Sequence, residues 1–136
     1  METPLDGHWA MIRAEMDGQS APELVVQRTR VLLSQGRYTV LFGGNLADQG
    51  RFIITSTGSA STLLLQGEEG PNAGRSIPCL FQHVGDRLRI CYGLDGTLPT
   101  TFGAAVGEAR YLATYRRGHP ADESPENGDP EPLPGL

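Results

Sequence analysis

The sequence predicts an all-β fold, an eight-stranded antiparallel up-and-down β-barrel with one short helix after the first strand. Short stretches of alternating apolar and polar residues recur along residues 5–117, and two-residue turn signals join several of them. No stretch shows the strand–helix alternation that is typical of a parallel sheet. A β-sandwich is the alternative. The barrel is preferred because eight strands just enclose an interior that side chains fill or that holds one small ligand.

The clearest element is the hairpin Ile77 to Gly93, in which two alternating apolar runs meet at the turn signal Gly85-Asp86. Pairing across this turn predicts one face composed of Cys79, Phe81, His83, Leu88, Ile90 and Tyr92, with Phe81 opposite Ile90, His83 opposite Leu88 and Cys79 opposite Tyr92. The opposite face is mixed and carries Leu80, Gln82, Arg87, Arg89 and Cys91. The two cysteines face opposite sides, so both are expected to be free thiols.

The stretch before this hairpin predicts five more strands. Residues 5–16 alternate as a first strand, and Ser20 to Glu23 matches a capping box that begins a short helix. A second turn signal, Gln35-Gly36, joins two strands and pairs Leu33 with Tyr38 and Val31 with Val40. These two strands and the two that follow are expected at residues 29–34, 37–42, 51–55 and 62–66, with a looser turn at 43–50 and a polar loop at 67–75.

The last strand is expected at residues 109–116, with Tyr111, Ala113 and Tyr115 on one face. An irregular segment rich in glycine, threonine and proline leads to it over residues 94–108, with Phe102 as its anchor. Residues 1–117 therefore form one barrel domain. Residues 118–136 contain five acidic residues, no arginine and five prolines, which predicts a disordered acidic tail.

Charge and composition exclude several classes of protein. Eleven acidic residues balance eleven arginines before the tail, so there is no basic field for nucleic acid. No apolar run approaches the length of a membrane span, and the N-terminus has no apolar leader, so a cytoplasmic protein is expected. The three histidines are widely spaced and no Cys/His grouping has ligand spacing, so neither a metal nor a cofactor is expected.

Several motifs in order resemble a lipocalin-like family known from planctomycetes and other bacteria. The motifs are Leu5-Asp-Gly-His-Trp9 with Arg13-Ala-Glu15, Gly36-Arg-Tyr-Thr-Val40, Gly70-Pro-Asn-Ala-Gly74, the hairpin Val84 to Tyr92, and Pro99-Thr-Thr-Phe102. The resemblance covers residues 5–117 and implies a barrel of the calycin type. Because the family is largely uncharacterised, the resemblance implies no reaction.

The resemblance also implies a structural role for Trp9. Gly7-x-Trp9 is similar to the first-strand signature of lipocalins, in which the tryptophan closes the barrel floor beneath an arginine of the last strand, here Arg116 or Arg117. Fatty-acid-binding proteins hold a carboxylate with Arg-x-Tyr on the last strand. Here Ala113 stands at the arginine position, so the resemblance does not extend to that carboxylate clamp.

Polar side chains on the predicted inward faces have two interpretations. They are Arg13, Glu15, Tyr38, His83, Tyr92, Tyr111 and Tyr115. In the first interpretation these groups satisfy one another or lie in water at the barrel mouth. In the second they form part of a site for one small apolar organic ligand. The catalytic candidates are His83, Arg13 and Tyr92, which would polarise a carbonyl or enol of the ligand. The residues expected to contact the ligand are Tyr38, Phe42, Phe52, Phe81, Tyr111 and Tyr115.

Two functional hypotheses follow, and whether the protein is an enzyme stays open. The first is a small-molecule barrel, extending to a cofactor-independent cyclase or isomerase of a polyketide-type intermediate. The second is a non-catalytic packed barrel that acts as a protein-interaction or carrier module. The interior volume discriminates between them, because a ligand site needs about 300 Å³ or more. The sequence leaves the oligomeric state open, a homodimer included.

Overall fold

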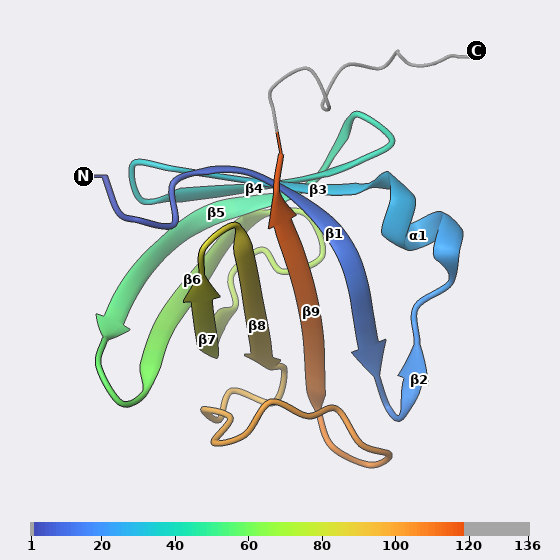
Figure 1. Cartoon of the computed structure of the whole chain (residues 1–136), viewed down its shortest axis with the longest axis vertical. Coiled ribbons are helices and arrows are strands. Elements are labelled where there is room, and N and C mark those ends of the chain that lie inside the picture. Colours follow the sequence, from blue (N-terminus) through green and yellow to red (C-terminus); the bar gives the residue numbers. More distant parts are fainter. Residues whose placement is uncertain (1, 119–136) are drawn as a thin grey trace.

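The computed structural model describes residues 2–118, and these form a closed antiparallel β-barrel (Figure 1). Its elements in chain order are β1 (Gly7–Met16), β2 (Gln19–Ser20), α1 (Glu23–Arg28), β3 (Thr29–Ser34), β4 (Arg37–Phe42), β5 (Asn45–Ser56), β6 (Ser61–Glu69), β7 (Ser76–Val84), β8 (Arg87–Gly93) and β9 (Arg110–Arg117). Apart from the two-residue β2, which pairs with the end of β1, the strands pair with their neighbours in chain order. Pairing of β1 with β9 closes the sheet, which confirms the eight-stranded barrel and excludes the sandwich.

Both predicted hairpin registers are confirmed. Across the turn between β7 and β8, Phe81 lies opposite Ile90 and Cys79 lies opposite Tyr92. Across the turn between β3 and β4, where Gln35 and Gly36 have φ of 51° and 80°, Leu33 lies opposite Tyr38. In the other turn Gly85 has a φ of 60°. Two-residue turns with positive φ at the first central residue match the right-handed twist of the strands, so these turns fix the register locally.

The strand β5 is longer than predicted. It begins at Asn45, directly after the Gly43-Gly44 turn, in a stretch that the sequence analysis assigned to a loop. This half of β5 contains Asn, Asp, Gln and Gly, which are uncommon in strands, so the sequence did not indicate a strand here. Pairing with β4 nevertheless holds it in the sheet, with a bulge at Ala47 that places Asp48 opposite Val40.

The helix begins differently from the prediction. Its N-cap is Pro22, which has no side-chain capping hydrogen bond, so the predicted capping box from Ser20 to Glu23 is wrong. Ser20 instead pairs with Glu15 in the short ladder between β1 and β2, which removes it from the helix terminus. The helix lies on the outside of the barrel against β1 and β4 (Figure 1).

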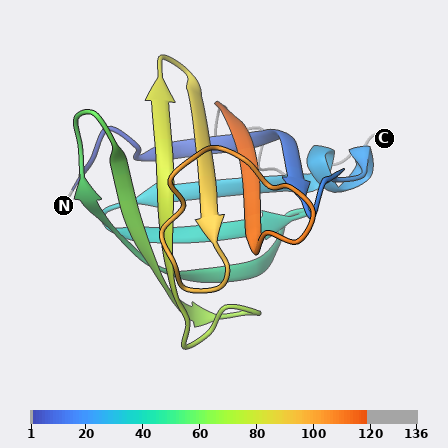
Figure 2. The same cartoon turned by 90° about the horizontal axis from the view of Figure 1, so that it is seen from below.

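The connections cover the two ends of the barrel differently. The N-terminal residues run across one end, and the segment between β8 and β9 crosses the other (Figures 1 and 2). In that segment Phe102 is the predicted anchor, and the guanidinium of Arg89 lies 3.9 Å from the centre of its ring. The thiol of Cys91 also contacts the carbonyl oxygen of Gly103, so the segment is attached to the outer face of β8.

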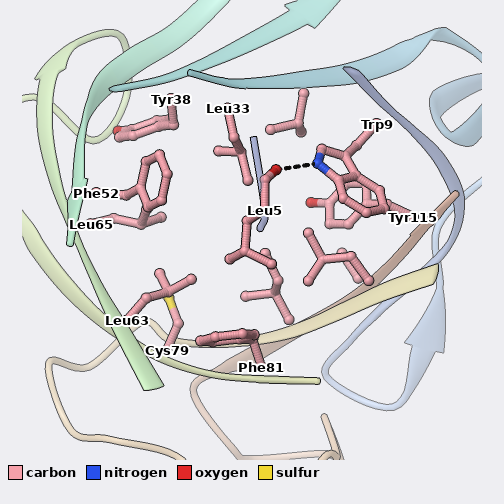
Figure 3. Packing of buried hydrophobic residues seen from close by; sticks show 14 of the residues in the cluster. Leu5, Trp9, Leu33, Tyr38, Phe52, Leu63, Leu65, Cys79, Phe81 and Tyr115 are labelled. Atoms are coloured by element: carbon pink, nitrogen blue, oxygen red, sulfur yellow. Dashed lines mark hydrogen bonds between the residues drawn. The ribbon is translucent and has the colours of Figure 1, made fainter. Parts of the chain in front are cut away.

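Buried apolar side chains from all around the barrel form one core, and Trp9 is among them (Figure 3). Trp9 is fully buried, its Nε1–H donates to the carbonyl oxygen of Leu5 at 2.8 Å, and Leu5 is itself 1% exposed. The guanidinium of Arg117 lies 4.3 Å from the centre of a Trp9 ring and donates to the carbonyl oxygens of Pro4 and Asp6. Leu5, Trp9 and Arg117 form the barrel floor, and Arg117 is the arginine of the predicted pair.

Candidate functional site

The interior of the barrel holds a cavity of about 280 Å³ that is partly open to solvent. Nineteen residues line it, and most are aliphatic or aromatic. They come from strands all around the barrel, because alternation turns every second side chain of each strand inward. Representative apolar members are Met11, Val31, Phe52, Leu63, Leu65 and Ile90. The interior is therefore only partly filled by side chains.

The polar side chains on one side of the cavity are tyrosines. The hydroxyls of Tyr92 and Tyr115 lie 2.8 Å apart, and the rings of Tyr92 and Tyr111 are 5.4 Å apart between centres. Burial raises the pKa of all three phenols above the ordinary tyrosine value. They are protonated at neutral pH, so they act as hydrogen-bond donors and acceptors without charge.

A carboxylate lies on another part of the cavity wall. Asp48 is 8% exposed, and its Oδ2 accepts hydrogen bonds from Asn72 Nδ2 at 2.8 Å and from the Tyr38 hydroxyl at 3.4 Å. Its Oδ1 is buried and has no hydrogen-bond partner in the described part of the chain. Burial, followed by the charge of Asp48 and the hydrogen bond to it, raises the pKa of Tyr38 to about 12. Tyr38 therefore acts as a neutral donor to this carboxylate.

Glycines allow the backbone and rings to approach each other at this carboxylate. A Cβ on Gly50 would lie 2.8 Å from Cε2 of the Tyr38 ring and 2.1 Å from the carbonyl oxygen of Gln66. A Cβ on Gly67 would lie 1.9 Å from the carbonyl oxygen of Asn72. Contacts under 3 Å are not tolerated by a side chain, so both glycines are required. Gly67 allows the loop 70–75 to fold against β6 and to place Asn72 beside Asp48.

Five of the predicted ligand-contact and catalytic residues line the cavity, namely Tyr38, Phe52, Tyr92, Tyr111 and Tyr115. Phe81 is buried in the core but is not part of the cavity wall. Phe42 is 40% exposed, because it ends β4 opposite Thr29 and Asn45, at the rim of the barrel. The prediction that Phe42 lies in the interior is wrong, because this residue is the last of β4 and its ring reaches solvent at the rim.

His83 lies at the barrel floor and not at the cavity. Its ring meets Trp9 edge-on with centres 5.7 Å apart, and its Nε2 is 2.9 Å from the carbonyl oxygen of Gly85. That contact requires the proton on Nε2, because a carbonyl oxygen only accepts. The predicted pairing of His83 with Leu88 is confirmed. The structure nevertheless does not bring His83 together with Tyr92.

Arg13 faces outward, so its predicted inward orientation is wrong. The register between β1 and β9 shifts between Met11 and Arg13, which leaves Ile12 in a bulge. The extra residue exchanges the two faces of β1 beyond this point, so Ala14 is buried where Arg13 was expected. The same shift turns Glu15 outward. Arg13 lies opposite Thr114, on the outer surface of the barrel.

The sequence analysis missed Asp48 and Asn72. Both lie in segments that were assigned to loops, residues 43–50 and 67–75. The alternation Asp48, Gly50, Phe52 along β5 was a usable signal, since it continues the inward face of a predicted strand by four residues. For Asn72 no comparable periodicity exists, because its position depends on how the loop folds back over β6.

No metal centre or membrane helix is found in the described part of the chain. Within residues 2–118, no three His, Cys, Asp or Glu side chains lie close enough to hold a metal ion. The helical structure in the same residues lacks the length and apolar character needed to cross a bilayer.

Taken together, fold and site define a closed eight-stranded antiparallel β-barrel with a largely apolar internal cavity that carries one carboxylate and a cluster of phenols. Comparison with known proteins adds no further identity, because no family model, no curated protein and no solved structure matches the chain. The resemblance to a lipocalin-like family therefore stays a proposal, and the predicted acidic tail lies outside the described residues.

Proposed function

We propose that the protein binds one small, mostly apolar organic molecule inside the barrel and acts as a carrier. The cavity of about 280 Å³ carries this proposal. Protein interiors are normally filled to crystal density, so a packed interaction module would not need such a space. Ligand pockets begin at about 300 Å³, so this cavity is at the lower end of their range and suits a small compound of up to three rings.

The Tyr92–Tyr115 pair gives such a ligand a polar contact. The two hydroxyls make one hydrogen bond with each other, so only one of their two protons is used. Within residues 2–118 the pair has no other partner, and the second proton is available to an oxygen atom of a ligand. A carbonyl or hydroxyl group on an otherwise apolar ring would match this donor.

A cofactor-independent cyclase or isomerase of a polyketide-type intermediate is the second candidate function, and the same donor pair favours it, because a phenol can polarise a carbonyl. The three catalytic candidates do not converge, however. Tyr92 lines the cavity, His83 lies at the barrel floor, and Arg13 is on the outer surface. Carriage is therefore preferred to catalysis.

A lipocalin-like relationship is part of the same proposal. The stacking of Arg117 on Trp9 at one end of the barrel supports it, because that pair is the feature that the resemblance implied. The absence of an arginine at position 113 is consistent with a ligand that carries no carboxylate.

The test is the fluorescence of N-phenyl-1-naphthylamine, an apolar probe that is neutral at pH 7, titrated with the protein. We expect saturable enhancement with one site per barrel. Val31→Phe places a ring in the cavity and is expected to weaken binding by about tenfold or more, which corresponds to about 1.4 kcal/mol. Leu32→Phe adds the same ring to the outer face of β3 and is the matched control, for which no change is expected. Absence of saturable binding, or equal loss in both variants, contradicts the proposal.

A further inference from the structure

We infer that the cavity selects a ligand that carries a protonated amine, which pairs with Asp48, and that it rejects carboxylates. This inference rests on the proposed function, since it names the chemical class of molecule that the cavity binds. It starts from charge: among the residues of the described chain that line the cavity, Asp48 is the one with a formal charge, and no arginine or histidine lies among them.

The carboxylate is buried without a direct cationic partner. Among residues 2–118, Asp48 has no ion-pair partner, and its two hydrogen-bond donors, Tyr38 and Asn72, are both neutral and both on Oδ2. Arg75 reaches this group only indirectly, because its guanidinium donates to Asn72 Oδ1 while Asn72 Nδ2 donates to Asp48. A buried charge that lacks a counterion is costly, so a cation that enters the cavity gains more than it would in water.

The nearby arginines are occupied elsewhere. Arg37 and Arg51 both pair with Glu68, at 2.7 Å and 3.3 Å, and the side chains of all three are 41–64% exposed. They therefore belong to the outer surface and do not compensate Asp48. Burial first, and then the Asp48 charge, keep Tyr38 protonated, which is consistent with a negative potential in this part of the cavity.

One oxygen of Asp48 is left for the ligand. Within residues 2–118, Oδ1 has no hydrogen-bond partner and almost no exposed surface of its own, while its side chain forms part of the cavity wall. Oδ1 lies beside Gly70, and the torsion about the Cβ–Cγ bond of an aspartate is broad, so binding would include a rotation that turns a carboxylate oxygen toward the cavity. An ammonium group at this position forms an ion pair with the carboxylate of Asp48. The ring that carries the ammonium group then contacts the apolar wall of the cavity. An anion in the same place would meet a like charge, and the donors near it, the phenols and the Asn72 amide, are all neutral.

The test uses three compounds that share one ring system: 1-naphthylmethylamine, 1-naphthalenemethanol and 1-naphthoate. The affinity of each compound is measured at pH 7 by its displacement of N-phenyl-1-naphthylamine from the protein. At this pH the first compound is a cation, the second is neutral and the third is an anion. The expected order of affinity is amine, alcohol, carboxylate, with at least a tenfold difference between the first and the last. A carboxylate that binds as tightly as the amine overturns the inference.

Two variants test whether Asp48 causes the preference for the amine. Asp48→Asn keeps the shape of the side chain and is expected to weaken amine binding about tenfold while alcohol binding changes less than threefold. Glu68→Gln removes an equal charge from the outer surface and is expected to change neither. Equal amine affinity in Asp48→Asn and the unmodified protein overturns the assignment to Asp48.

The two proposals fail separately. If the neutral probe and the alcohol bind but the amine has no advantage, the carrier function stands and the charge selection is wrong. If none of the compounds binds, both are wrong. Should Asp48→Asn fail to fold, the affinity order in the unmodified protein still decides the inference.

Discussion

Replacing Trp9 by alanine is expected to lower the free energy of unfolding by about 3–5 kcal/mol, the usual cost of truncating a large aromatic residue in a core. Trp9 has no exposed surface, so the whole indole volume becomes a cavity. The variant also loses the hydrogen bond to Leu5 and the stacking contact with Arg117. Both contacts fasten the N-terminal residues across the barrel floor, so the loss is placed at the upper part of this range.

Trp9→Phe separates these contributions. The phenyl ring keeps much of the apolar volume, but the carbonyl oxygen of Leu5 loses its donor while Leu5 stays buried. An unsatisfied buried polar group costs about 1–3 kcal/mol, which is the expected effect of this variant. Trp9→Ala should therefore be the more damaging substitution.

Urea unfolding followed by far-UV circular dichroism measures both values. Circular dichroism is needed because Trp9 is the single tryptophan of the chain, and its fluorescence is lost in both variants. Ile53→Ala is the control, since Ile53 is 52% exposed and surface substitutions usually change stability by less than about 0.5 kcal/mol. A loss for Trp9→Ala no larger than that of the control refutes the account of the barrel floor.

Three further outcomes are expected. Gly50→Ala should lower the free energy of unfolding by about 1–3 kcal/mol, because the added Cβ would lie 2.1 Å from the carbonyl oxygen of Gln66 in β6. Gly103→Ala is the control: its Cβ would meet nothing within 4 Å, so the same urea assay should show almost no change. The pKa of Tyr38 is raised to about 12, so the folded state keeps a proton that the unfolded chain loses near pH 10. The contribution of Tyr38 to the free energy of unfolding is therefore fully present below pH 10 and falls as the pH rises towards 12. Urea unfolding between about pH 9 and 12 should show a shallower decline in Tyr38→Phe, and an equal decline would contradict the shift. Burial raises the pKa of the Cys79 and Cys91 thiols, so both should react with a disulfide reagent only after unfolding, and rapid reaction of the folded protein would show that the barrel opens.

Local turn chemistry explains why much of the fold could be predicted. Gly85-Asp86 and Gln35-Gly36 each join alternating runs, and a two-residue turn fixes the register of the strands it connects. The faces of β4 and β8 follow from these registers and the face of β9 from its alternation, which is why four tyrosines were correctly expected to point inward.

Bulges explain the main errors. The extra residue at Ile12 reverses the faces of β1 and turns Arg13 outward, and a second extra residue, Ala47, comes just before the inward-facing positions Asp48, Gly50 and Phe52 of β5. Neither bulge has a signature such as glycine in the sequence. A bulge forms where two strands of the closed barrel must stay aligned, so it depends on residues that are distant in the chain.

Depth along the barrel axis was also beyond the reach of the sequence. Alternation assigns a side chain to a face, but it does not say at which level of the barrel the side chain lies. His83 and Phe42 illustrate this: the first lies beside Trp9 at the floor, and the second lies at the rim with 40% of its surface exposed. The cavity lies between these levels, so neither residue lines it.

An isotope-filtered NOE experiment on the labelled protein with bound, unlabelled N-phenyl-1-naphthylamine tests the interior site most directly. The probe should show contacts with the methyl groups of Val31, Leu63 and Ile90, which line the cavity from three different strands. Contacts confined to exposed methyl groups, such as those of Ile53 and Val106, would contradict an interior site.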